Sequence, residues 1–428
     1  MTEAIGSNQG RAGYGWVVLA VCTVLITMAY GLMFSYGVFF KPLASHFHWD
    51  RAQTSAVYSL SMLLRGVFAI LVGWLADRFG AKILLLACGI IVLIAFVSSS
   101  LVHSLWQFFM AYGVLLAIGL SGAYGISTSV VAKWFNRRSG LALGIASMGS
   151  GFGTLIVVPL SAKLIEAYGW STTFVIYGVG GGVLMVAAAL LIREPNARTD
   201  ADTPAHKAGN VSLREALRQP ELYLISIVMF CFVFCAQVVI VHLVNYATGL
   251  GVPISGAAAI ISLIGLVSIG GRLITGYWGD KIDVLNLMLI APMVTMASFI
   301  ILIFFRSAAA VYPFAVVYAF AYGAEVPLVP MVAKRYFGTK SMAALVGVFL
   351  CAGGLGGAAG PLVGGWTFDE THSYRSVFVI GTVLLAIVLV PIGVLKARAK
   401  RELRLASAAS SGERSGALRT GPRSSQRV

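Results

Sequence analysis

Three charged side chains, Arg65, Arg272 and Glu325, lie inside long apolar segments of this 428-residue chain. A charge placed in a membrane is costly, so each such residue is a candidate functional site. An arginine stays charged and offers a two-pronged fork that fits a carboxylate. A glutamate can bind and release a proton. These residue types indicate chemistry on a small organic anion and a proton.

Arg272 and Glu325 are expected at the same depth. Arg272 precedes Asp280 by eight residues and Glu325 precedes Lys334 by nine, which places them about 12 and 13 Å inside the helix ends. We therefore expect an Arg272–Glu325 ion pair in which substrate carboxylate competes for the arginine and the released glutamate takes the proton. The alternatives are a static ion pair, a glutamate turned away from the cavity, or an arginine that snorkels to the surface.

Arg65 lies deeper, twelve residues before Asp77 and thus about 18 Å from the helix end. It is a candidate second anion contact, which would favour a dicarboxylate. It could equally pair with Glu325 or with a backbone carbonyl.

Polar aromatic side chains accompany these charges. A tyrosine hydroxyl donates to a carboxylate while its ring bounds a small cavity, and this makes Tyr30, Tyr124, Tyr318 and Tyr322 candidate substrate contacts. His242 could titrate near neutral pH and act in proton coupling or in gating. A neutral histidine bonded to a neighbouring helix is the equally weighted alternative.

The elements that must position these residues are membrane helices. Hydrophobic residues make up 58% of the chain, charged residues 11%, and mean hydropathy is +0.88, which excludes a water-soluble enzyme. Roughly 20 apolar residues cross a membrane as a helix, and twelve such runs occur without the period of two that marks strands. The predicted helices are 15–40, 53–75, 82–101, 105–132, 140–164, 171–192, 221–248, 255–278, 284–304, 309–332, 341–365 and 375–396.

The predicted domains follow from these runs. Residues 1–14 form an N-terminal segment, 15–192 and 221–396 form two six-helix bundles, 193–220 form a polar linker, and 397–428 form a disordered basic tail. With the N-terminus inside, 24 Lys and Arg residues lie on the inner side and 5 on the outer side. This asymmetry predicts that both termini are cytoplasmic, in a plasma or inner membrane. The net charge of +15 therefore indicates orientation and contact of the tail with anionic lipid, and not nucleic acid.

No cofactor, metal or enzymatic activity is expected. The five cysteines lie in apolar segments without a neighbouring histidine or acid, and no GxxxxGK[ST] loop implies ATP. The first apolar run is too long for a signal peptide and has no small-residue cleavage site. A membrane enzyme or receptor would need a polar cluster or a large extramembrane domain. The implied partners are a small carboxylate, a proton and lipid, and no oligomer is required.

The halves of the chain repeat. GWLADRFGAK at 73–82 is echoed by GYWGDK at 276–281, and two further segments repeat in the same order at nearly the same offset. Two six-helix halves related about the membrane normal are typical of secondary transporters. We therefore predict an all-α polytopic membrane protein of two pseudo-symmetric bundles.

The first copy resembles the helix 2–3 signature of the major facilitator superfamily. The matching residues are Gly73, Asp77, Arg78, Gly80 and Lys82, and the resemblance covers about 14–396. It implies a cytoplasmic latch, because a small residue lets helix ends approach while acid and bases pair or cap helix ends. The second copy is degenerate and contributes Asp280 to the expected gate.

Within that superfamily the chain resembles the monocarboxylate transporter and oxalate/formate antiporter branch. The segments that carry this are GYGWVVL at 13–19, FSYGVFFKPL at 34–43, HLVNYATGLG at 242–251 and GRLITG at 271–276. The resemblance implies that Arg272 binds substrate carboxylate and that Tyr124 and Tyr322 lie on helices that line the site. Phe34 and Ser268 replace a lysine and an acid of the animal transporters, and 341–365 has no counterpart of the oxalate exchanger's lysine.

These observations predict a secondary transporter of small organic anions by alternating access. The expected cargo is a monocarboxylate such as lactate, pyruvate or formate, coupled to protons through Glu325. A dicarboxylate exchanger that uses Arg65 with Arg272 is the first alternative. A drug or sugar transporter of the same fold is the second, although the predicted lining is poor in Asn and Gln.

Overall fold

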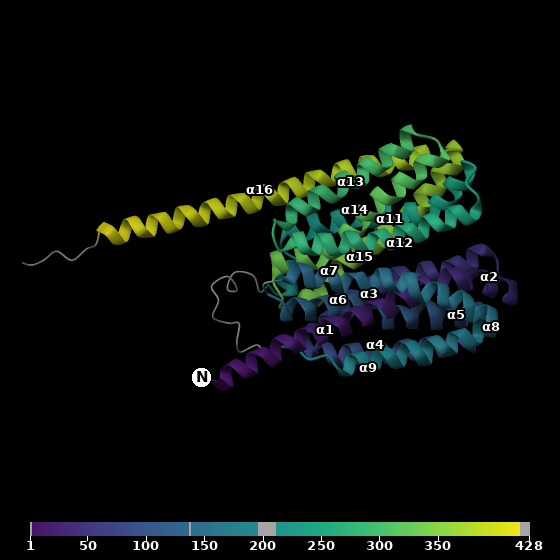
Figure 1. Cartoon of the computed structure of the whole chain (residues 1–428), viewed down its shortest axis with the longest axis horizontal. Coiled ribbons are helices and arrows are strands. Elements are labelled where there is room, and N and C mark those ends of the chain that lie inside the picture. Colours follow the sequence, from purple (N-terminus) through teal and green to yellow (C-terminus); the bar gives the residue numbers. More distant parts are fainter. Residues whose placement is uncertain (1, 137, 196–210, 420–428) are drawn as a thin grey trace, which may run out of the picture.

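Long apolar helices build the structure, a computed structural model that describes residues 2–136, 138–195 and 211–419 (Figure 1). In these residues, 11 helical stretches are long and apolar enough to cross a membrane. Ser139–Leu190 has 52 residues, about 78 Å of helix against a hydrocarbon core of roughly 30 Å. It breaks at Gly169, whose φ of 79° favours glycine. The chain therefore crosses twelve times, and the predicted all-α class is confirmed.

The first six crossings form one bundle. Three short π-helical turns, η1 to η3, interrupt its helices, and such turns bend a helix locally. The elements are α1 (Thr2–Phe34), α2 (Tyr36–Phe47), α3 (Arg51–Phe79), α4 (Ala81–Ser100), α5 (Leu105–Phe108), η1 (Phe109–Leu115), α6 (Leu116–Trp134), α7 (Ser139–Phe152), η2 (Gly153–Val157), α8 (Val158–Ile176), η3 (Tyr177–Gly181) and α9 (Gly182–Leu190).

The second bundle begins after a one-turn helix, α10 (Leu213–Ala216). Ser212 and Glu215 form a capping box at its start, and the hydrogen bonds that Glu215 accepts lower the pKa of its carboxyl group. The crossings that follow are α11 (Pro220–Gly249), α12 (Ile254–Gly279), α13 (Val284–Phe304), α14 (Ala308–Phe337), α15 (Met342–Thr371) and α16 (Arg375–Arg419).

The two bundles lie side by side, and Figure 1 shows the first half below the second. The backbone near Arg193 bonds to the end of α6, and Val211 bonds to the end of α14. We call this end of the molecule the linker end. The first turns of α1 and the last turns of α16 extend beyond the bundles there (Figure 1).

The helices at both termini are longer than predicted. α1 begins at Thr2 and not near residue 15, and α16 continues to Arg419 through the segment expected to be disordered. The extension of α16 is rich in Ala, Leu, Arg, Lys and Glu, which are strong helix formers even where no apolar periodicity marks a packed face. The predicted linker and tail fall partly outside the described residues, at 196–210 and 420–428.

Close glycine contacts join the bundles along two helix pairs, α3 with α15 and α7 with α12. A Cβ atom on Gly73 would lie 2.5 Å from the carbonyl oxygen of Ala343, and one on Gly144 would lie 2.8 Å from Cα of Gly276. Helices in lipid associate through such small-residue packing because lipid tails are as apolar as the helices themselves. The glycines therefore set how closely the two halves meet.

The same packing within a bundle generates a stability prediction. A Cβ on Gly182 would lie 2.6 Å from Cβ and 2.9 Å from Cα of Leu93, whereas one on Gly180 would contact nothing within 4 Å. We expect Gly182→Ala to destabilise the protein by about 1–3 kcal/mol, because the α4 backbone cannot yield. Gly180→Ala, two residues away, should leave it unchanged or slightly more stable. Thermal unfolding in detergent measures the stability of both variants. Equal unfolding midpoints for Gly182→Ala and Gly180→Ala would contradict the close packing of Gly182 on α4.

Candidate functional site

Asp77, at the end of α3, caps a helix of the opposite bundle. Its Oδ1 and Oδ2 accept hydrogen bonds from the backbone N–H groups of Ala343 and Ala344 at 3.4 and 3.0 Å. These groups lie in the first turn of α15, whose own N-cap residue, Ser341, makes no capping bond. A carboxylate is favourable there because the first amides of a helix lack intrahelical partners.

Asp280 makes the equivalent contact from the second bundle to the first. Its oxygens accept from the N–H groups of Gly140 and Leu141 at 2.6 and 2.9 Å. These residues begin α7, which also has no side-chain cap of its own. Asp280 follows Asp77 by 203 residues, and Ala343 follows Gly140 by the same offset, which is the offset that relates the repeats. At the linker end, each bundle thus provides a carboxylate that caps a helix of the other bundle.

Lys334 strengthens the same closure. Its Nζ donates to the carbonyl oxygens of Ala132 and Phe135 and to Oγ of Ser139 at 2.8–3.0 Å. A cation at the carbonyl end of a helix is favourable, and this one lies at the end of α6.

The other signature residues have different positions. Gly80 turns the chain between α3 and α4 with a φ of 96°. Arg78 is exposed beside the rings of Trp74 and Phe79, and Lys82 is exposed. Of the expected gate residues, Gly73, Asp77 and Asp280 therefore join the bundles directly.

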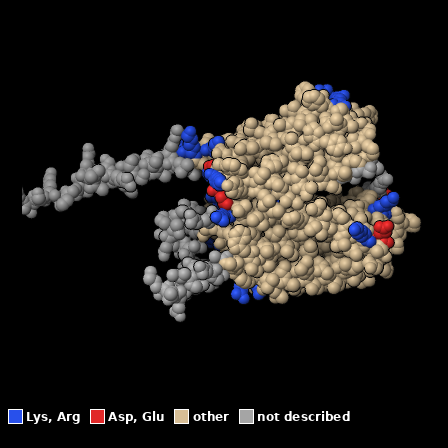
Figure 2. Space-filling view, viewed as in Figure 1, with Lys and Arg blue, Asp and Glu red and all other residues tan. Residues whose placement is uncertain are grey.

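A cavity of about 480 Å³ lies between the bundles. Residues of α1, α3, α6, α7, α11, α14 and α15 line it. Figure 2 shows the surface hollowed between the halves at the end opposite the linker end, with the charged side chains near the two ends of the molecule. The space is therefore built where the two bundles face each other.

Arg65 is half-buried and lines this cavity from α3. Its guanidinium carbon lies 5.4 Å from the ring centroid of Tyr30, which also lines the cavity. Within the described part of the chain, Arg65 forms no ion pair and no hydrogen bond, although it lies within a helix long and apolar enough to cross a membrane. An uncompensated cation is thus available to a ligand.

Arg272 is 2% exposed and is not among the residues that line the cavity. Its Nη1 donates to Oγ of Ser268 at 2.5 Å, its guanidinium lies 5.7 Å from the ring centroid of Tyr322, and its Nε has no partner. A Cβ on Gly151 of α7 would touch Nη1 at 3.3 Å. Buried polar groups are nearly always paired, so this half-satisfied arginine needs an explanation.

The expected Arg272–Glu325 ion pair is wrong. Glu325 of α14 is buried and accepts from the Thr295 hydroxyl of α13 at 3.2 Å, and the Tyr322 ring stands beside the arginine instead. The carboxylate of Glu325 faces α13 and the cavity, and not Arg272 on α12. Glu325 also has no ion pair to Arg65.

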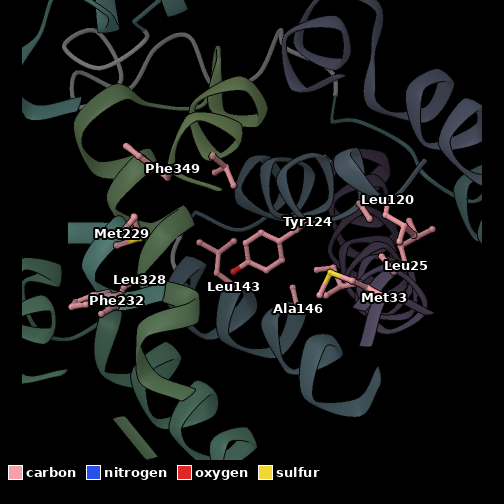
Figure 3. Packing of buried hydrophobic residues seen from close by; sticks show 14 of the residues in the cluster. Leu25, Met33, Leu120, Tyr124, Leu143, Ala146, Met229, Phe232, Leu328 and Phe349 are labelled. Atoms are coloured by element: carbon pink, nitrogen blue, oxygen red, sulfur yellow. The ribbon is translucent and has the colours of Figure 1, made fainter. Parts of the chain in front are cut away.

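Tyr124 connects the bundles at the cavity wall. Its hydroxyl donates to the carbonyl oxygen of Val326 on α14 at 2.9 Å and accepts from Ser147 of α7 at 3.1 Å. Val326 has a free carbonyl because Pro330, four residues on, has no N–H to complete the helical bond. Figure 3 shows Tyr124 reaching from its helix toward Leu143, with residues of both halves around it. Tyr30 packs edge-on against Tyr124, with ring centroids 5.9 Å apart.

Two predicted site residues lie away from the cavity lining. Tyr318 is buried in a stack between Phe314 and Tyr322, with a hydroxyl that has no partner. His242 lies 3.1 Å from the carbonyl oxygen of Pro361 through Nε2. For His242, this contact with a neighbouring helix is the alternative that the sequence left open.

The sequence prediction missed several polar lining residues, among them Tyr58, Gln237 and Ser121. Tyr58 lies seven residues before Arg65, two helical turns on the same face, and this spacing could have identified it. Gln237 and Ser121 carry no comparable signal.

A cavity between two membrane-spanning bundles is typical of a membrane transporter. Here, contacts between the bundles close it at the linker end. The chain belongs to the Major Facilitator Superfamily, whose family model matches residues 19–361. It is a multi-pass integral membrane protein.

Curated relatives place it near the predicted branch. It is 24% identical over 414 residues to Monocarboxylate transporter 12 of Mus musculus, covering 89% of this chain and 85% of the relative. It is 25% identical over 364 residues to the Oxalate:formate antiporter of Oxalobacter formigenes, covering 82% and 87%. The fold matches a crystal structure of the transporter FucP in the outward conformation with a TM-score of 0.72, 15% identity and coverage of 87% and 97%. The resemblance drawn from the sequence is confirmed.

The paired caps lead to a prediction about the gate. We expect Asp77→Asn and Asp280→Asn each to shift the protein toward opening at the linker end, because a carboxylate at a helix N-terminus contributes about 0.3–2 kcal/mol. Spin labels at the exposed Lys82 and Lys340 of the two halves would then report a larger population at long distance.

Asp283→Asn is the matched control. Asp283 pairs with Arg335 at 2.7 Å and caps α13, both within the second bundle. Its removal should leave the distance distribution unchanged. A gate variant with the wild-type distribution would contradict a role for that cap in closure.

Proposed function

We propose that the protein is a secondary active transporter of small organic anions that works by alternating access. The observation that carries the proposal is an unpaired arginine, Arg65, in a mid-membrane cavity with a second, half-satisfied arginine buried nearby. A membrane protein keeps such costly charges for a substrate or ion pathway. Similarity to proteins named monocarboxylate transporters and oxalate:formate antiporter supports a carboxylate cargo of the lactate, pyruvate or formate type.

The two arginines have successive roles in this proposal. In the conformation described, Arg65 and Tyr30 receive the carboxylate in the open cavity. Arg272 binds the carboxylate when the bundles close at the end opposite the linker end. Its free Nε and its Ser268-bound Nη1 leave capacity for a two-pronged contact. Tyr30 lies beside Arg65, and Tyr322, which lies beside Arg272, lines the same cavity. Tyr124 and Tyr322 bound the site.

We propose that the linker end is cytoplasmic. The excess of Lys and Arg on that side, 24 against 5, supports this orientation. The conformation described is then outward-facing, and both termini are inside a plasma or inner membrane, where the basic end of α16 meets anionic lipid.

Glu325 is the proposed proton site. Its carboxyl group faces the cavity and has no cation within ion-pair distance in the described residues. Acidic side chains inside membrane segments often belong to proton relays in pumps and transporters. His242 lies outside the cavity lining. We assign it a packing role near the end opposite the linker end, and not a role in proton transfer.

A dicarboxylate exchanger is the second candidate. The presence of two embedded arginines, one beside Tyr30 and one beside Tyr322, favours it, because a dianion could contact both. Counterflow in liposomes separates the two candidates, since strict dependence on an internal anion indicates exchange. A sugar carrier is disfavoured because Gln237 is the single amide side chain among the described lining residues.

The anchoring roles can be tested by charge-conserving substitutions. We expect Arg272→Lys and Arg65→Lys each to lower carboxylate uptake about tenfold or more, because lysine cannot reproduce the bidentate fork and one lost contact is about 1.4 kcal/mol. Arg306→Lys, in an exposed loop, is the control. Uptake of every carboxylate at the wild-type rate in Arg272→Lys would remove that residue from the site.

Proton coupling has a separate test. We expect Glu325→Gln to abolish uptake driven by a pH gradient in proteoliposomes and to retain counterflow, because glutamine keeps the shape of the side chain but cannot release a proton. Glu166→Gln, an exposed acid on α8, should behave as wild type. Full pH-driven uptake by Glu325→Gln would rule out this route.

A further inference from the structure

The cavity has two chemically different walls. Arg65, Tyr30, Tyr58 and Ser121 line it from the first bundle. From the second bundle, α14 contributes Tyr322 and Glu325, whereas the lining residues of α11 and α15 are apolar or glycine, apart from Gln237. The positive charge is thus confined to one side of the space.

The apolar wall is extensive and adaptable. Phe232, Val233 and Ile240 of α11 face the cavity together with Phe349 and Leu350 of α15. Met229 of α11 adds to this wall, and Met33 and Met62 line the cavity from the first bundle; their flexible thioethers fit differently shaped apolar groups. Such a wall is solvated poorly by water and well by hydrocarbon.

Glycines of α15 enlarge this side of the cavity. Gly353, Gly354 and Gly357 all line it. A Cβ on Gly354 would meet only the carbonyl oxygen of Met62, at 3.7 Å, an ordinary van der Waals contact. The helix could therefore carry a side chain at Gly354 without strain, and its absence leaves space beside the apolar wall.

From this division we infer that the cargo is a monocarboxylate with a bulky apolar body, branched aliphatic or aromatic. The inference rests on the proposed function and narrows its substrate class. The carboxylate lies at Arg65 and Tyr30, and the body lies against α11 and α15. Formate, acetate and oxalate leave the apolar wall uncovered, and a second carboxylate meets no second cation among the lining residues described.

The expected gain follows from burial of hydrocarbon. Each methylene group moved from water to an apolar site improves affinity about fourfold. Affinity should therefore rise by well over tenfold from acetate to 3-methylbutanoate and again to phenylacetate. The increase should require the charge, because Arg65 orients the ligand.

The experiment measures ligand-induced thermal shifts of the purified full-length protein, and competition for uptake in proteoliposomes, with acetate, 3-methylbutanoate, phenylacetate, malonate and the neutral phenylacetamide. A ligand that binds the native state raises its unfolding temperature. We expect phenylacetate to bind tightest, acetate and malonate weakly, and phenylacetamide not at all.

Filling the glycine space is the structural arm of the test. Gly354→Leu should weaken phenylacetate about tenfold or more and change acetate less than about threefold. Gly365→Leu is the matched control on the same helix, because Gly365 is outside the lining and a Cβ there contacts nothing within 4 Å. If Gly354→Leu lowers the unfolding temperature of the ligand-free protein, Gly354→Ala is tested in its place. It should weaken phenylacetate binding in the same direction by a smaller factor.

The outcomes separate the two proposals. Acetate or malonate binding as tightly as phenylacetate, or Gly354 variants that lose all carboxylates equally, would overturn the apolar-body inference and leave anion transport standing. No binding or uptake of any carboxylate by the folded protein, or equal binding of phenylacetamide, would overturn the proposed function itself.

Discussion

The exchange of helix caps between the bundles is the interaction on which the rest of the architecture depends. α15 and α7 each begin without a side-chain cap of their own, and Asp77 and Asp280 supply it from the opposite half. Each cap exists only while the bundles meet at the linker end. A contribution of about 0.3–2 kcal/mol per carboxylate is large enough to bias a conformational equilibrium and small enough to be reversed. The surface is hollowed at the opposite end of the molecule (Figure 2).

The membrane explains why so few polar residues matter so much. Lipid supplies no hydrophobic force between helices, so the bundles approach through glycines such as Gly73 and Gly144. Every buried polar group must then find a partner inside the protein. Tyr124 does so through the carbonyl of Val326 that Pro330 leaves free, whereas the buried Nε of Arg272 does not, and Arg65 is half-buried at the cavity without an ion pair in the described residues. In the proposed function, these cations are where a ligand binds.

Particular residues show how far sequence reasoning reached. The repeat and the crossings were predictable, because apolar runs and a repeated motif are visible along the chain, and the motif marked Gly73, Asp77 and Asp280 as gate residues without showing that they contact the opposite half. The depths of Arg272 and Glu325 were predictable from 1.5 Å per residue. Their pairing was wrong, since depth leaves open which neighbour a side chain faces, and Tyr322 and Thr295 were the actual neighbours.

The sequence by itself determined the membrane class, the two-half architecture, the three embedded charges and the motif at the linker end. These properties are local, because hydropathy and motif spacing are summed over neighbouring residues. Only the tertiary structure decided that Arg65 lines the cavity while Arg272 lies behind it, and that the wall of α11 and α15 is apolar. Those outcomes depend on the rotation of each helix about its axis, which is set by contacts between residues far apart in the chain.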